Sequence, residues 1–188
     1  MPTKKKIYEL KKGEKIPLMY DECARIMFSN PNRMEPITLL VSKILNVDYQ
    51  KIEGKIELLP TRQDNVRVNK KKTECDIVVK VDFDKTRCGL IIEINVKDRF
   101  YETVINRNIF YMNRLFGNDL NEHDTYKNIS DLYLINFNTF FTDDINKNIF
   151  DYHYFMNSDG HILTEKQKIL NINIAECHKL LYDKSEIK

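Results

Sequence analysis

Three polar side chains that could bind a cation lie on two neighbouring segments of the chain. Asp76 lies in 74–82, and Glu93 and Asn95 lie in 89–97; both segments alternate apolar and polar residues. Successive side chains of a strand point to opposite faces, so the alternation predicts a hairpin of two strands. Burial of their apolar faces places the three polar side chains together on the other face. Carboxylates held on a rigid strand pair suit a hard divalent cation such as magnesium, and a metal-dependent nuclease is the first hypothesis.

Glu93 stands out because it interrupts LIIEINV, a run apolar enough for a central strand. Such a strand is covered on both faces, and a carboxylate there is costly unless it is paired, protonated or bound to metal. Surface strands also carry carboxylates routinely, so a solvated strand face is the alternative interpretation of the pair.

A phosphodiester resists hydrolysis because its oxygens repel an attacking hydroxide. A bound cation neutralises that charge and lowers the pKa of its water, and Asp76 and Glu93 could bind one or two such cations. Asn95 offers an amide oxygen to metal or water, or an NH2 donor to phosphate, but no positive charge. We therefore expect Lys80, placed diagonally across from Glu93, or Lys97, two residues after Asn95, to stabilise charge or orient water.

The remaining sequence predicts the elements that position these residues. We expect an α/β domain over 17–188, with a mixed sheet flanked by helices, preceded by a flexible basic arm at 1–16. Helices are predicted at 18–29, 35–46, 100–116 and 175–183, and strands at 55–59, 74–82, 89–97, 131–140, 149–156 and 168–174. The last strand is predicted at an exposed edge, where a second copy could pair with it to form a homodimer.

The helix at 100–116 has two distinguishable faces. One is apolar at helical spacing and is expected to face the core: Tyr101, Ile105, Ile109, Met112 and Phe116. Arg107, Tyr111 and Arg114 lie on another face. They could contact phosphate and stack on a base, or they could form an ordinary solvated helix face.

Positive charge is concentrated in two segments although the net charge is only +2. Residues 1–15 carry six lysines and two glutamates, and residues 62–72 carry five basic residues and one acid. The second segment ends in Lys70, Lys71 and Lys72 and leads directly to Asp76, so it could hold a phosphate backbone near the carboxylates. A solvated tail and a solvated loop are the alternatives.

Composition excludes several other classes of protein. No apolar run approaches the length of a membrane helix, and no apolar stretch follows the N-terminal lysines, so we expect a cytoplasmic protein. Its four cysteines form no CxxC pair, which argues against zinc. Cys75 and Cys88 flank the hairpin and are expected to be small, reduced core residues.

The segment from Pro17 to about Phe140 resembles the PD-(D/E)XK nuclease superfamily, and more narrowly the recombination-promoting nucleases often labelled transposases. The matching pieces, in order, are PLMYDECARIMFSN, VSKILN, ECDIVVKV, GLIIEIN and RNIFYMNRL. This resemblance implies a restriction-endonuclease-like sheet. It also implies magnesium, or manganese in its place, bound by Asp76 and by the Glu93 carboxylate of an E-x-N motif that includes Asn95.

Two further features follow from the same resemblance. The opening helix of that family carries an acid where Asp21 stands, although an exposed helix acid is the alternative for this residue. A helix motif of the R-N-x-x-x-Y kind falls loosely on Arg107, Asn108 and Tyr111. The lysine that the superfamily carries after the glutamate is absent here, because Asn95 occupies its position.

The sequence thus favours a magnesium-dependent DNA endonuclease of low sequence specificity, linked to recombination, mobile elements or phage defence. A catalytically weak or inactive DNA-binding or regulatory member of the same family is the second hypothesis. An RNA-directed nuclease ranks last, because no aromatic RNA-binding signature is present.

Overall fold

The computed structural model describes residues 21–63, 73–84, 86–95, 101–116, 123, 125–138, 148–174 and 177. The helices are α1 (Asp21–Phe28), α2 (Glu35–Leu45), α3 (Tyr49–Ile52), α4 (Tyr101–Phe116) and the 3-10 turn η1 (Tyr126–Asn128). The strands are β1 (Ile56–Leu59), β2 (Arg62–Gln63), β3 (Thr73–Glu74), β4 (Ile77–Phe83), β5 (Thr86–Asn95), β6 (Asp131–Asn138), β7 (Phe150–Met156) and β8 (Ile162–Asn173).

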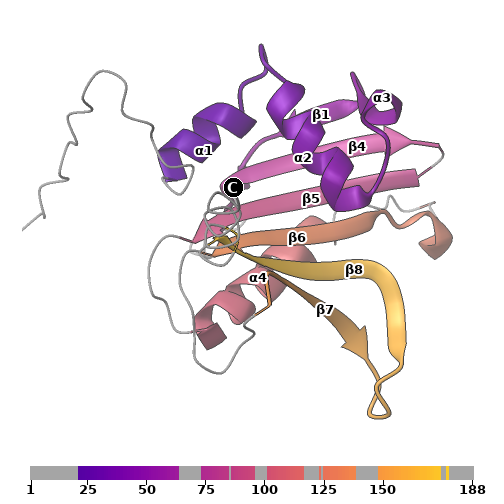
Figure 1. The fold of residues 1–188 in the computed structure, drawn as a ribbon. Helices are drawn as coiled ribbons and strands as arrows, with labels where there is room; N and C mark the ends of the chain where they lie inside the picture. The colour runs from indigo at the N-terminus through magenta and orange to yellow at the C-terminus, as the bar shows by residue number, and fades with distance from the viewer. Residues whose placement is uncertain are drawn as a thin grey trace, which may run out of the picture.

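Six strands form one mixed sheet in the order β1-β4-β5-β6-β8-β7 (Figure 1). The β5–β6 and β6–β8 pairs are parallel, and the β1–β4, β4–β5 and β7–β8 pairs are antiparallel. Helices flank this sheet on both sides (Figure 1). The arrangement is the restriction-endonuclease-like α/β fold that the sequence predicts.

The two faces of the sheet carry different cores. Helices α1, α2 and α3 cover one face (Figure 1), where the side chains of Ile77, Val79, Leu90 and Ile92 are fully buried. The other face packs against α4, which leads from β5 to the parallel strand β6, as a parallel connection requires. Asp76 and Glu93 belong to the α4 face because they alternate with the residues of the first core.

The β4–β5 hairpin is tighter than the predicted segments suggest. Phe83 pairs with Thr86 across the turn, where Asp84 adopts a left-handed conformation with φ of 45°. This register places Lys80 opposite Gly89. The prediction that Lys80 lies diagonally across from Glu93 is therefore wrong, because the strands extend farther into the turn than the alternation indicates.

The buried face of helix α4 matches the predicted one only in part. Its fully buried residues are Val104, Asn108 and Met112, whereas the predicted core residue Ile109 is 39% exposed. The helix covers a part of the sheet that is itself polar around Glu93, so its inward face is partly polar. The assignment by apolar spacing is therefore correct for Met112 and wrong for Ile109.

Strand β8 is interior rather than at the edge. It starts at Ile162, earlier than the predicted 168–174, and pairs with β6 on one side and β7 on the other. The predicted homodimer contact through this strand is therefore wrong, since both of its backbone edges are occupied. Most of the predicted helix at 175–183 lies outside the described residues. Along the part of the chain that the structure describes, no helix is long and apolar enough to cross a membrane.

Candidate active site

Asp76 and Glu93 lie side by side at the open end of the β4–β5 hairpin, next to its first residue pair. Ile77 pairs with Ile92, so the residue before β4 stands beside Glu93 of β5. The backbone N–H of Asp76 donates to Glu93 Oε1 at 3.2 Å, and the N–H of Ile94 donates to Asp76 Oδ2 at 2.8 Å. The sheet backbone thus fixes one oxygen of each carboxylate.

Two arginines from opposite sides of the sheet engage the remaining oxygens. Arg25 of α1 donates from Nη2 to Asp76 Oδ1 at 2.7 Å. Arg107 of α4 places Nη2 3.5 Å from Glu93 Oε2 as an ion pair. The pair of carboxylates is therefore neutralised by the pair of guanidinium groups in this state.

Burial controls the protonation of Glu93. The residue is 3% exposed, and this burial, reinforced by the neighbouring Asp76 charge, raises the pKa of its carboxyl to about 7 against the opposing effect of Arg107. The same surroundings raise the pKa of the Cys75 thiol and of the Tyr111 phenol, chiefly through burial. A carboxyl that is partly protonated at neutral pH must lose its proton to bind a cation, so cation binding at Glu93 would release protons and would strengthen as pH rises.

The oxygen donors fit a magnesium-type cation. Magnesium is commonly bound by one or two carboxylates, with water and substrate phosphate completing its shell. Asp76 and Glu93 supply such a pair. No group of three or more His, Cys, Asp or Glu side chains suited to a metal occurs among the described residues.

Helix α4 contributes two of the residues predicted to bind DNA. The Tyr111 hydroxyl donates to the Glu74 carbonyl oxygen at 3.2 Å, and the Arg107 guanidinium carbon lies 5.8 Å from the centre of the Tyr111 ring. Arg107 and Tyr111 thus line the inner side of the carboxylate pair rather than a solvated face. Arg114 lies farther along the same helix and is partly exposed.

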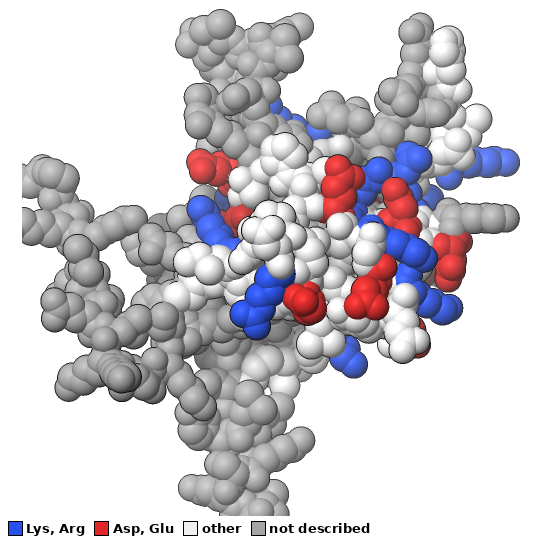
Figure 2. Space-filling model, turned by 90° about the horizontal axis from the view of Figure 1, so that it is seen from above, with Lys and Arg blue, Asp and Glu red and all other residues white. Residues whose placement is uncertain are grey.

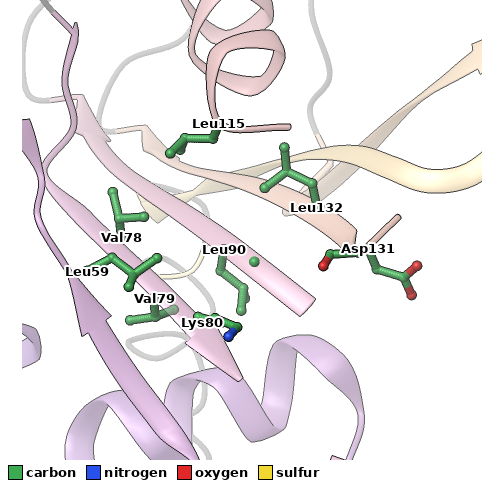
Figure 3. Close-up of a pocket in the computed structure, with 10 residues that line it drawn as sticks. Leu59, Val78, Val79, Lys80, Leu90, Leu115, Asp131 and Leu132 are labelled. Carbon is green, nitrogen blue, oxygen red and sulfur yellow. The ribbon is translucent and has the colours of Figure 1, made fainter. Parts of the chain in front are cut away.

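Lys80 lies away from the carboxylates, on the lining of a small pocket toward the other end of the sheet (Figure 3). It forms an ion pair with Asp82 at 3.3 Å. The rest of that lining is mostly apolar, with Leu59, Val78 and Leu132 around it.

For several predicted site residues, the side chain lies outside the part of the chain that the structure describes. Asn95 ends β5 with its backbone paired to Asn138, and Asp21 begins α1, but the side chains of both lie outside the described part. Lys97 and the lysines at 70–72 lie wholly outside the described residues.

Arg25 and a polar row across the sheet were not predicted from the sequence. Glu93, Asn136, Asn171 and Asp151 are cross-strand neighbours on β5, β6, β8 and β7. Asn136 donates to Asn171 Oδ1 at 2.9 Å, and His153 Nε2 lies 2.7 Å from Asp151 Oδ2 and 2.9 Å from Asn171 Nδ2. The alternating asparagines of LINFN and LNIN were the available signal. For Arg25 the signal was its place one turn after Asp21.

The family model described as PD-(D/E)XK nuclease family transposase matches residues 19–187. No curated protein matches the chain, and no solved structure matches it.

Proposed function

The chain belongs to the PD-(D/E)XK nuclease family transposases, and from this membership we propose that it is a metal-dependent endonuclease that hydrolyses DNA phosphodiester bonds. The observation that carries the proposal is the Asp76–Glu93 pair, with the two carboxylates side by side on adjacent strands and each hydrogen-bonded to the sheet backbone. A nuclease family implies a nucleic-acid substrate, and DNA is the proposed one.

Asp76 and Glu93 would hold magnesium, or manganese in its place. The cation would supply the positive charge that a phosphodiester lacks and would make water a better nucleophile. The protein's own contribution is to keep the two carboxylates aligned. The N–H groups of Asp76 and Ile94 fix their orientation, and burial keeps bulk water away from Glu93.

The DNA backbone would be held by positive groups around this centre. Arg107 and Arg114 of α4 and the basic segment 62–72 are the proposed contacts, with Tyr111 beside them. Lysines, arginines and acids are interspersed on the face that carries α1, α2 and α3 (Figure 2). Local contacts to phosphate rather than a broad basic surface are therefore proposed, and because phosphate contacts carry no sequence information, low sequence specificity is expected.

A cleavage assay on purified protein tests this function. Plasmid and single-stranded DNA are incubated with magnesium, manganese, calcium or EDTA, using the wild type and the Asp76→Ala and Glu93→Ala variants. We expect cleavage with magnesium or manganese and none in either variant, with folding retained. Asp82→Asn is the matched control, because this aspartate lies on β4 but on the exposed part of the strand. A Glu93→Ala protein that cuts at the wild-type rate would refute the assignment.

A second function is favoured by one observation. Both carboxylates already carry arginine partners, and Asn95 replaces the superfamily lysine, so a chain that binds DNA without cutting it is the alternative. Such a regulatory member of the family would retain DNA binding in EDTA and show no cleavage with any cation.

A further inference from the structure

As the structure describes it, strand β5 carries no cationic side chain beside Asp76 and Glu93. The superfamily lysine position is occupied by Asn95, and an amide carries no charge. Lys80 is directed to Asp82 at the far end of the hairpin. Lys97 lies outside the described residues, so among the described ones a substitute for the lysine is sought on another element.

Helix α1 supplies a guanidinium at the required place. Ala24 and Phe28 of this helix are buried in the core beneath it, and they fix the helix against the sheet. Arg25 lies on the side of α1 that reaches Asp76, 2.7 Å from Oδ1. The contact is formed by residues 51 positions apart in the chain, so it is a product of the fold.

Arg25 and Arg107 differ in their access to a substrate. The side chain of Arg25 is 44% exposed, whereas that of Arg107 is 18% exposed and held on the buried Glu93. Arg25 is therefore the more accessible of the two to a DNA strand that approaches from solvent. Arginine also presents a planar donor fork that matches two phosphate oxygens.

We propose that Arg25 is the group that supplies positive charge to the scissile phosphate. When Asp76 binds a divalent cation, the Arg25 guanidinium moves from Asp76 to the phosphate oxygens. This inference rests on the proposed nuclease function. In the metal-free state Arg25 neutralises Asp76, and in the reacting state it neutralises charge that develops on the phosphate. Arg25 is then both a competitor of the cation and a contributor to cleavage.

These two roles predict opposite effects of one substitution. Arg25→Met removes the charge but keeps an aliphatic side chain of similar length. Because the competing guanidinium is gone, we expect the metal-free variant to bind Mn²⁺ several-fold more tightly. Because the phosphate loses its partner, we expect single-turnover cleavage to slow by about 100-fold or more. Arg25→Lys keeps the charge and is expected to recover most of that rate.

The experiment measures cation binding and cleavage separately. Mn²⁺ binding is followed by calorimetry on protein without DNA, and cleavage by single-turnover kinetics at saturating Mn²⁺, with thermal unfolding as the check on folding. Arg87→Ala is the control, because Arg87 is half exposed and also paired with an aspartate, Asp82, at 3.8 Å. It is expected to change neither binding nor cleavage.

The inference is overturned if Arg25→Met cleaves within about twofold of wild type, or if its Mn²⁺ affinity falls together with its unfolding temperature, as a structural role would require. Failure of the proposed function is distinguishable. Absence of cleavage by the wild type, with Mn²⁺ binding unchanged in Glu93→Gln, removes both proposals. Cleavage that is lost in Glu93→Gln but intact in Arg25→Met removes only the role of Arg25.

Discussion

Glu93 is the residue in which fold and chemistry conflict most directly. A carboxylate on a central strand is costly to ionise, and its pKa of about 7 reflects this. The unfolded chain would ionise it near the ordinary value of about 4.3. Between these two values the native state binds more protons than the unfolded state, so this residue makes stability fall as pH rises. The free-energy cost of ionising Glu93 in the native state is absent below its pKa in the unfolded chain and complete above its pKa in the native state.

Glu93→Gln mimics the protonated carboxyl and should remove this pH dependence. In EDTA, we expect the variant to be more stable than wild type by on the order of 3 kcal/mol at pH 8, and by much less at pH 5. Chemical denaturation at the two pH values measures the difference. Asp82→Asn, an exposed acid on the neighbouring strand, should give no such trend. An equal difference at both pH values would show that charge burial is not its cause.

The residues of this site were predictable in unequal measure. Asp76 and Glu93 follow from strand alternation, because burying one apolar face fixes which side chains share the other face. Arg25 and Arg107 do not follow, since a long side chain reaching across from a helix depends on how that helix docks. The predicted position of Lys80 was wrong for a different reason. It depends on the length of the turn, and a shift of the pairing register moves every cross-strand neighbour.

Among the elements, α4 shows most clearly what the sequence pattern can and cannot predict. Its existence and bounds were predicted, because apolar residues recur at helical spacing. Its inward face was predicted only in part, correctly at Met112 and wrongly at Ile109, because the sheet beneath it is polar near Glu93 and apolar farther on. Asn108 is buried there beside Arg107, and Met112 packs on the apolar part with Val78 and Leu134.

A pair of alanine substitutions tests which face of α4 is buried. Met112→Ala is expected to lower the free energy of unfolding by about 2–5 kcal/mol, because the methionine is 2% exposed and truncation leaves a cavity. Ile109→Ala, at a predicted core position that is 39% exposed, should change it by less than about 1 kcal/mol. Denaturant titration of both variants measures the two values. Equal losses would mean that the helix is rotated from its place in the structure.

For the whole molecule, the distribution of charge matters more than its total. The chain carries 30 basic and 28 acidic residues, and the face that bears α1, α2 and α3 intersperses both signs (Figure 2). Such a surface gives little general attraction to DNA. Affinity should then depend on local segments, and Lys70, Lys71 and Lys72 lie just before the strand pair that carries Asp76.

Replacing these three lysines together with alanine measures how much that segment contributes to DNA binding. Each phosphate contact contributes about 0.9 to the slope of log affinity against log salt concentration. We therefore expect the slope for duplex DNA, measured in calcium by fluorescence anisotropy, to become shallower by about 3. Affinity should fall for all sequences alike, because phosphate contacts carry no base information.

A second triple variant separates local contact from net charge. Lys43, Lys51 and Lys127 are exposed on α2, α3 and η1, and replacing them with alanine removes the same three charges elsewhere. If the segment at 70–72 binds phosphate directly, only its own variant loses salt dependence. If both variants lose it equally, DNA responds to total charge, and the basic segment is a solvated loop. The comparison is decisive because the two proteins have identical net charge and differ only in where it lies.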